Sequence, residues 1–174
     1  MKRITTKDFI LNLKENATFE ETYLAIVEED NLLQGEKPIT NPENWKVYKS
    51  HKKGGTIVNF KNDICIANFS RNNYKFGIDF LQLLASYLFN RGLNALVLGN
   101  DILIDGKYKV ASYAGYIING MIYTAIHISL SVDLDIVYQF CDKSTIKIPK
   151  GLNDYNITTE EIEHFIINNI DSII

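Results

Sequence analysis

The stretch from Gly99 to Ser112 constrains the fold of this 174-residue chain more than any other. It places the pair Asp105-Gly106 between an apolar run, Ile102 to Ile104, and a segment in which apolar and polar residues alternate, Lys107 to Val110. This arrangement is the strongest short-range signal for a β-hairpin, because both central positions of the favoured turn require positive φ. A two-residue loop predicts the pairs Ile104 with Lys107, Ile102 with Lys109, and Asn100 with Ala111.

The predicted register gathers polar side chains at one end of this hairpin. Paired residues share a face of the sheet, so Asn100 and Lys109 are expected on one face, with Asp101 at the mouth of the hairpin on the other. An amide, a cation and a carboxylate held there could bind an acyl phosphate. The alternative is an exposed lysine in an ordinary hairpin, because Asp-Gly hairpins are common.

Composition limits the classes of protein that fit. The length predicts a single domain over residues 1–174, and 46% hydrophobic with 22% charged residues is typical of a soluble globular protein. A net charge of −3 argues against a general nucleic-acid binder. No apolar run is long enough to cross a membrane, and the N-terminus does not read as a signal peptide. The two cysteines, Cys65 and Cys141, indicate buried thiols in a reducing cytoplasm.

Patterns along the chain predict mixed helices and strands. Capping boxes, Thr18 to Glu21 and Thr158 to Glu161, each predict a helix start. Helices are expected near Phe9 and Ile10, over 19–34, 74–91 and 134–140, and after Thr158. Strands are expected as an antiparallel meander over 45–49, 56–60 and 64–69, and then over 93–98, leading into the hairpin of 100–112. Two further strands are expected over 109–118 and 121–132 around Asn119-Gly120. This order predicts an α+β fold, a mainly antiparallel mixed sheet with helices on one face.

A second candidate site lies in the segment His51 to Thr56. Lys52 and Lys53 precede Gly54 and Gly55, and two glycines allow successive backbone N–H groups to converge on an anion. The alternative is a glycine turn with solvated lysines.

Taken together, these motifs resemble a known family. Gly-Asn-Asp-Ile, an apolar run, and Asp-Gly-x-x-Lys-Val-Ala-Ser are similar to the signature of the biotin/lipoate protein ligases. The resemblance implies a catalytic domain related to class II aminoacyl-tRNA synthetases. It implies that Asn100 and Asp101 lie near nucleotide phosphates, with Asp101 at magnesium, and that Lys109 contacts the acyl carbonyl and the phosphate. The loop of Lys52, Lys53, Gly54 and Gly55 would fold over the acyl-adenylate.

The resemblance also implies an activity. An acyl-protein ligase of this type uses ATP and Mg²⁺ to convert lipoate, octanoate or biotin into an acyl-adenylate, and passes the acyl group to a lysine of a lipoyl or biotinyl carrier domain. Two alternatives stay open: an ATP-independent octanoyl or lipoyl transferase with Cys141 as nucleophile, and a non-catalytic scaffold or binding homologue. The sequence does not specify the acyl group, the carrier or the oligomeric state. His127 is expected to be a structural residue of a strand.

Overall fold

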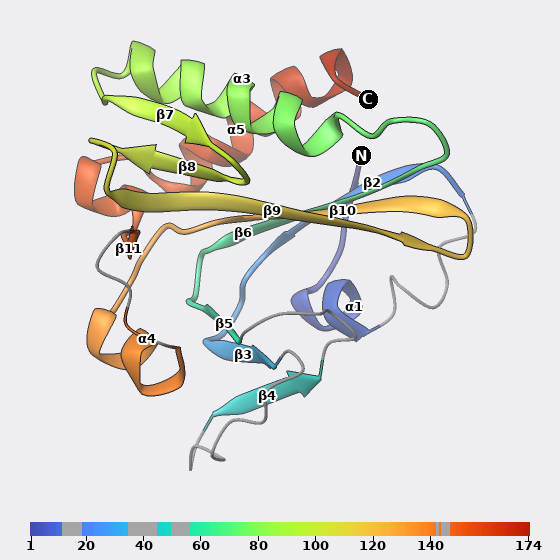
Figure 1. Ribbon diagram of the computed structural model, residues 1–174. Coiled ribbons are helices and arrows are strands. Elements are labelled where there is room, and N and C mark those ends of the chain that lie inside the picture. The colour runs from blue at the N-terminus through green and yellow to red at the C-terminus, as the bar shows by residue number, and fades with distance from the viewer. Residues whose placement is uncertain (12–18, 35–44, 50–55, 142, 144–146) are drawn as a thin grey trace.

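The computed structural model describes residues 1–11, 19–34, 45–49, 56–141, 143 and 147–174. Within them, a large sheet of eight strands has the order β1-β2-β6-β10-β9-β8-β7, with β11 added beside β9 (Figure 1). Its strands are β1 (Lys2–Arg3), β2 (Glu21–Ile26), β6 (Ile64–Ser70), β7 (Ala95–Leu98), β8 (Asp101–Ile104), β9 (Tyr108–Ile118), β10 (Met121–Ile128) and β11 (Ile148–Pro149). A small sheet has the order β4-β3-β5, from β3 (Asn31–Gln34), β4 (Lys46–Lys49) and β5 (Ile57–Asn59).

The large sheet is covered on both faces. Helices α3 (Phe76–Asn90) and α5 (Thr159–Asn169) lie on one face, and α1 (Thr6–Leu11), α4 (Leu134–Phe140) and the small sheet lie on the other (Figure 1). Two 3₁₀ turns, η1 (Leu152–Tyr155) and η2 (Ile170–Ser172), flank α5. The main core fills the space between the sheet and α3 and α5, and includes Phe76, Phe80, Ile102, Ile126 and Ile166. The predicted mainly antiparallel sheet flanked by helices is confirmed, but the helices occupy both faces.

Several predicted elements form for the expected local reasons. Asp133 caps α4 by accepting hydrogen bonds from the backbone N–H groups of Asp135 and Ile136. Thr158 and Glu161 make both bonds of the capping box at the start of α5. Asn119 and Gly120 have positive φ and join β9 to β10, as an Asn-Gly hairpin turn requires. Strand β10 ends at Ile128, four residues short of the prediction.

The predicted helix over 19–34 is wrong. The described part of this segment forms strands β2 and β3. Strand β2 is covered on both faces, so consecutive residues such as Leu24 and Ala25 are both buried. A strand buried on both faces loses the alternating pattern, and its apolar residues can then fall at helical spacing. Thr18, the proposed N-cap, lies outside the described residues.

The predicted meander over 45–69 is also wrong, although its three strands exist. Strand β4 pairs in parallel with β3, and β5 pairs with β3 in the antiparallel sense. Strand β6 lies in the large sheet between β2 and β10. Because 31–34 was predicted as helix, the true partner of β4 and β5 was missing from the prediction.

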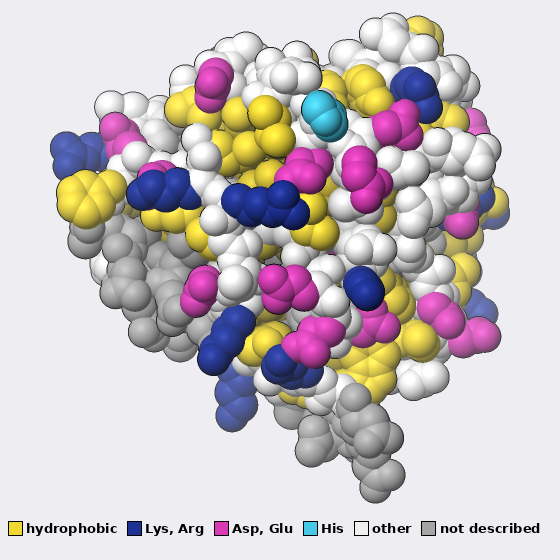
Figure 2. Space-filling model, turned by 180° about the vertical axis from the view of Figure 1, so that it is seen from behind, with side chains coloured by type: hydrophobic (Ala, Val, Ile, Leu, Met, Phe, Trp, Pro, Cys, Tyr) yellow, Lys and Arg dark blue, Asp and Glu magenta, His cyan; other side chains and the backbone are white. Residues whose placement is uncertain are grey.

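The face shown in Figure 2 carries acidic and basic side chains interspersed, with no large area of one sign. This distribution agrees with the small net charge of the whole chain. No helix among the described residues is long and apolar enough to span a bilayer.

Candidate functional site

The turn after β8 and a β-bulge in strand β9 determine which residues surround Lys109. The turn after β8 spans Asp105, Gly106 and Lys107, and Ile104 pairs with Tyr108, not with Lys107. Farther along, Leu103 pairs with Lys109 but Ile102 pairs with Ala111, so Val110 is an extra residue in β9. The predicted two-residue loop and its register are therefore wrong.

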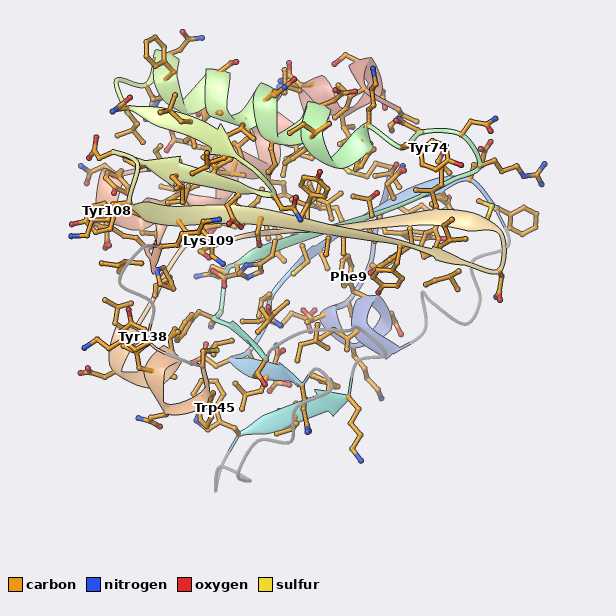
Figure 3. All side chains as sticks on the ribbon, in the orientation of Figure 1. Phe9, Trp45, Tyr74, Tyr108, Lys109 and Tyr138 are labelled. Atoms are coloured by element: carbon orange, nitrogen blue, oxygen red, sulfur yellow. The ribbon has the colours of Figure 1, made fainter. Side chains whose placement is uncertain are left out.

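The bulge decides which side chains share a face with Lys109. In a regular strand, residues 109 and 112 would point to opposite faces. An extra residue reverses the alternation locally. Val110 and Ala111 pack together into the core beneath α3, while Lys109 and Ser112 line a cavity on the opposite face. Figure 3 shows Lys109 on the face of the sheet that is turned towards α4.

A row of polar side chains crosses the large sheet at this level. In the strand register, Asp101 lies opposite Ser112, Ser112 opposite His127, and His127 opposite Cys65. Residues paired in this way present their side chains on one face. Four strands, β8, β9, β10 and β6, therefore each contribute one polar group to the cavity face.

Asp101 forms ion pairs with two lysines, Lys109 and Lys147. The carboxylate is nearly buried; one oxygen lies 2.6 Å from Nζ of Lys147 and the other 4.0 Å from Nζ of Lys109. Asp101, and not Asn100, is thus the partner of Lys109. Asn100 is exposed in the turn before β8, and its backbone carbonyl accepts a hydrogen bond from Tyr113 N–H. The predicted placement of Asn100 beside Lys109, with Asp101 on the other face, is wrong because the turn holds three residues and not two. Lys109 therefore pairs with Leu103, and Leu103 and Asp101 share one face of the sheet.

A cavity of about 240 Å³ lies between the large sheet, β5 and α4. Lys109 and Lys147 line it together with Ser112, His127 and Cys141. Among the described residues, this end of the cavity has two ammonium groups beside one carboxylate, an arrangement that favours an anion such as a phosphate.

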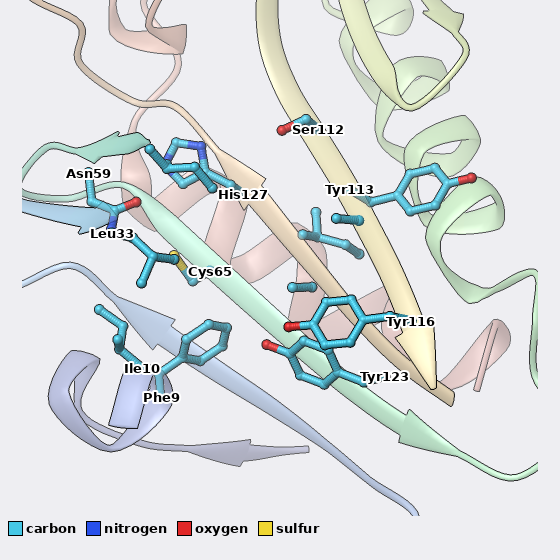
Figure 4. Close-up of a pocket in the computed structure, with 14 residues that line it drawn as sticks. Phe9, Ile10, Leu33, Asn59, Cys65, Ser112, Tyr113, Tyr116, Tyr123 and His127 are labelled. Atoms are coloured by element: carbon cyan, nitrogen blue, oxygen red, sulfur yellow. The ribbon is translucent and has the colours of Figure 1, made fainter. Parts of the chain in front are cut away.

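A smaller and mainly apolar pocket of about 70 Å³ adjoins this cavity, and the two share Ile57, Ser112 and His127. Figure 4 shows Phe9 of α1 opposite the neighbouring rings of Tyr116 and Tyr123. Burial raises the pKa of Tyr116 to about 12 and raises that of Tyr123 well above its ordinary value. Both phenols are therefore neutral at pH 7, and the pocket suits an uncharged apolar group.

His127 stands where the cavity and the pocket meet. Its Nε2 lies 3.0 Å from Oδ2 of Asp63, and the Asp63 side chain is completely buried. Asp63 also accepts hydrogen bonds from the backbone N–H groups of Phe60 at 3.0 Å and Leu130 at 2.7 Å. His127 is hydrogen-bonded as expected of a structural histidine, yet its ring also lines both hollows.

The two cysteines differ. Cys65 is buried, as predicted, and burial raises the pKa of its thiol. Cys141 was also predicted to be buried, but it is partly exposed, lines the cavity, and donates a hydrogen bond to the Thr56 carbonyl oxygen at 3.2 Å. It is the C-cap residue of α4, and Val137 and Tyr138 of this helix line the cavity with it.

The structure brings together only part of the predicted site. Lys109 and Asp101 meet, while Lys52, Lys53, Gly54 and Gly55 lie outside the described residues. Sequence reasoning missed Lys147, which reaches Asp101 because β11 pairs with the start of β9. It also missed Asp63, whose only sequence signal was a polar residue at the end of a turn before a buried strand.

The described residues do not assemble a magnesium site. They contain no cluster of three or more His, Cys, Asp or Glu side chains that could hold a metal ion. The oxygens of Asp101 already face two ammonium groups, which a divalent cation would have to displace. The metal role of Asp101 stays a prediction.

No family model matches the sequence, and a search of curated proteins finds no match either. Solved structures, in contrast, match nearly the whole chain. A lipoate-protein ligase A bound with ATP has a TM-score of 0.74 at 12% identity, over 99% of this chain and 83% of that chain. A bipartite lipoate protein ligase from Thermoplasma acidophilum, described with its E2 lipoyl domain, has a TM-score of 0.73 at 14% identity, over 99% and 82%. The biotin protein ligase from Aquifex aeolicus has a TM-score of 0.58 at 10% identity, over 99% and 68%.

These similarities extend over both sheets and the helices, at identities too low to transfer an activity. The chain has the fold of the lipoate- and biotin-protein ligases, in a strongly divergent sequence.

Proposed function

We propose that the protein is an acyl-protein ligase of the lipoate or biotin type. It activates a carboxylic acid with ATP as an acyl-adenylate and transfers the acyl group to a lysine of a lipoyl or biotinyl carrier domain. The observation that carries the proposal is the junction of a cationic cavity, formed at Lys109 and Lys147, with the apolar pocket. The fold supports it, as do relatives of that fold described with ATP and with a lipoyl domain.

The two hollows match the two ends of an acyl-adenylate. An apolar acyl chain in the pocket beside Phe9 and Tyr123 would leave its carboxyl carbon near His127 and its phosphate near Lys109. The carboxylate of Asp101 lies 4.0 Å from Nζ of Lys109, on the same face of the sheet. Lys109 would stabilise negative charge on the carbonyl oxygen and the α-phosphate, and a single well-aimed donor of this kind contributes about 3–4 kcal/mol. Within this proposal Asn100, Lys52, Lys53, Gly54 and Gly55 are nucleotide-binding residues, as the family resemblance implies.

Substitution of Lys109 tests the proposal. The formation of acyl-adenylate from ATP and lipoate, octanoate or biotin should fall by about 10²–10³-fold in Lys109→Ala. Lys107→Ala is the matched control, because Lys107 lies in the turn of the same hairpin and does not line the cavity. Lys107 is exposed in the turn, and in Lys109→Ala the carboxylate of Asp101 keeps its closer partner, Lys147, so both variants should unfold nearly like the wild type. Full activity of Lys109→Ala would refute the assignment of this site.

The position of Cys141 supports a second candidate function, the ATP-independent transferase, because its thiol lines the same cavity as Lys109. Only a transferase passes through a thioester on the protein. Mass spectrometry after incubation with an octanoyl thioester would show an adduct on Cys141 in that case, and Cys141→Ser would abolish transfer. We expect no adduct and near-normal ligation by Cys141→Ser.

A further inference from the structure

We propose that His127, held by Asp63, is the general base of the acyl-transfer step. This inference rests on the proposed function and adds a residue that the sequence motifs do not contain. It starts from the position of His127, which lines both the cationic cavity and the apolar pocket.

That position is where the reacting carbon belongs. The acyl chain lies on the pocket side and the phosphate on the side of Lys109, so the carbonyl carbon lies between them. Ile57, Ser112 and His127 are the residues common to both hollows. Of the three, only His127 has a side chain with a ring nitrogen that can act as a general base.

Asp63 fixes the tautomer of His127. The backbone N–H groups of Phe60 and Leu130 donate to its carboxylate, which therefore also accepts a hydrogen bond from the ring Nε2–H. This arrangement leaves the lone pair on Nδ1 of the same ring. Since Asp63 is fully buried and bonded to two backbone segments, the ring is held in one orientation.

The reaction needs such a base. A carrier lysine is almost entirely protonated at pH 7, and only the neutral amine attacks. His127 takes one proton from the lysine ammonium, and the neutral amine nitrogen then forms a bond to the carbonyl carbon. The carbon–oxygen bond to the phosphate breaks and AMP leaves with the electron pair. The nitrogen releases its second proton to solvent, and His127 returns its own proton to solvent. Positioned bases of this kind contribute about 10²–10⁴-fold to a rate.

The variant His127→Gln tests whether His127 acts as a general base or only as a structural residue. Its side-chain amide can still donate to Asp63, but it has no basic nitrogen. Chemically prepared octanoyl-adenylate is given to the protein with either Nα-acetyl-lysinamide or hydroxylamine as acceptor. Hydroxylamine is neutral at pH 7, so it does not require removal of a proton before attack.

We expect His127→Gln to transfer octanoate to the lysine derivative about 10²-fold more slowly than the wild type, with hydroxamate formation nearly unchanged. Added imidazole should partly restore transfer to lysine. Equal loss with both acceptors, or no loss with either, would overturn the role of His127 while leaving the ligase proposal standing. A wild type that neither forms nor consumes the adenylate would refute the ligase proposal, and this inference with it.

Discussion

At the scale of single residues, the site depends on buried polar groups that are fully paired. Asp63 is the clearest case, because its carboxylate joins the loop at Phe60, the chain at Leu130, and His127 of β10. Burying a carboxylate without such partners would cost several kcal/mol. The tyrosine pair at the far end of the apolar pocket gives a second case that can be tested by pH.

We predict that the free energy of unfolding falls between about pH 10 and pH 12. Burial raises the pKa of Tyr116 to about 12 in the folded protein, against an ordinary value near 10. Below pH 10 both states carry the neutral phenol; above it the unfolded chain ionises first, so unfolding becomes easier. Urea denaturation at pH 9 and pH 11 measures the loss, and the loss should be smaller in Tyr116→Phe. An equal loss in both proteins would contradict the assignment to Tyr116.

At the scale of elements, the position of segment 129–131 after β10 matters because the backbone N–H of Leu130 donates a hydrogen bond to Asp63. The chain just after Gly151 is hydrogen-bonded to this segment: Leu152 N–H donates to the Ser129 carbonyl oxygen, and Asn153 N–H donates to the Leu130 carbonyl oxygen. A Cβ at position 151 would lie 2.4 Å from the Leu130 carbonyl oxygen. Backbone cannot move aside as a flexible side chain can.

Gly151→Ala should therefore destabilise the protein by about 1–3 kcal/mol, the usual cost of overpacking. Gly115→Ala is the control, because its Cβ would meet the Tyr123 carbonyl oxygen at an ordinary 3.5 Å. Thermal unfolding of both variants checks this prediction. A Gly151→Ala protein as stable as Gly115→Ala would show that the segment adapts.

At the scale of the whole molecule, the candidate site lies between the large sheet and the layer formed by β5 and α4. A ligand bound there contacts elements of both layers, and therefore stabilises the folded state as a whole. A ligand at 100 times its dissociation constant adds about 2.7 kcal/mol. For a chain of this length that corresponds to a rise in Tm of roughly 5–10 °C.

We therefore expect ATP together with the cognate acid, sought among lipoate, octanoate and biotin, to raise the Tm of the wild type and of Lys107→Ala. The rise should be much smaller in Lys109→Ala. Differential scanning fluorimetry measures it. If no acid changes the Tm at saturating ATP, the non-catalytic scaffold becomes the better interpretation.

The sequence by itself determined the features that depend on neighbouring residues alone, such as helix caps and hairpin turns. The capping box at Thr158, the cap at Asp133 and the Asn119-Gly120 turn each bring their own hydrogen bonds or backbone angles, so these elements could be read directly. The motif around Lys109 also indicated the fold that the structural comparisons show.

Only the tertiary structure decided the pairing of strands and the composition of the site. The segment 19–34 forms strands because neighbours cover both faces of β2, which no local pattern reveals. The three-residue turn pairs Lys109 with Leu103 and so places it on the face of Asp101, and the extra residue at Val110 brings Ser112 to the same face. Lys147 becomes part of the site by contacting Asp101, 46 residues away, and Asp63 by contacting His127, 64 residues away. Such contacts depend on which surfaces pack together, and the free energy that selects them comes from burial across the whole fold.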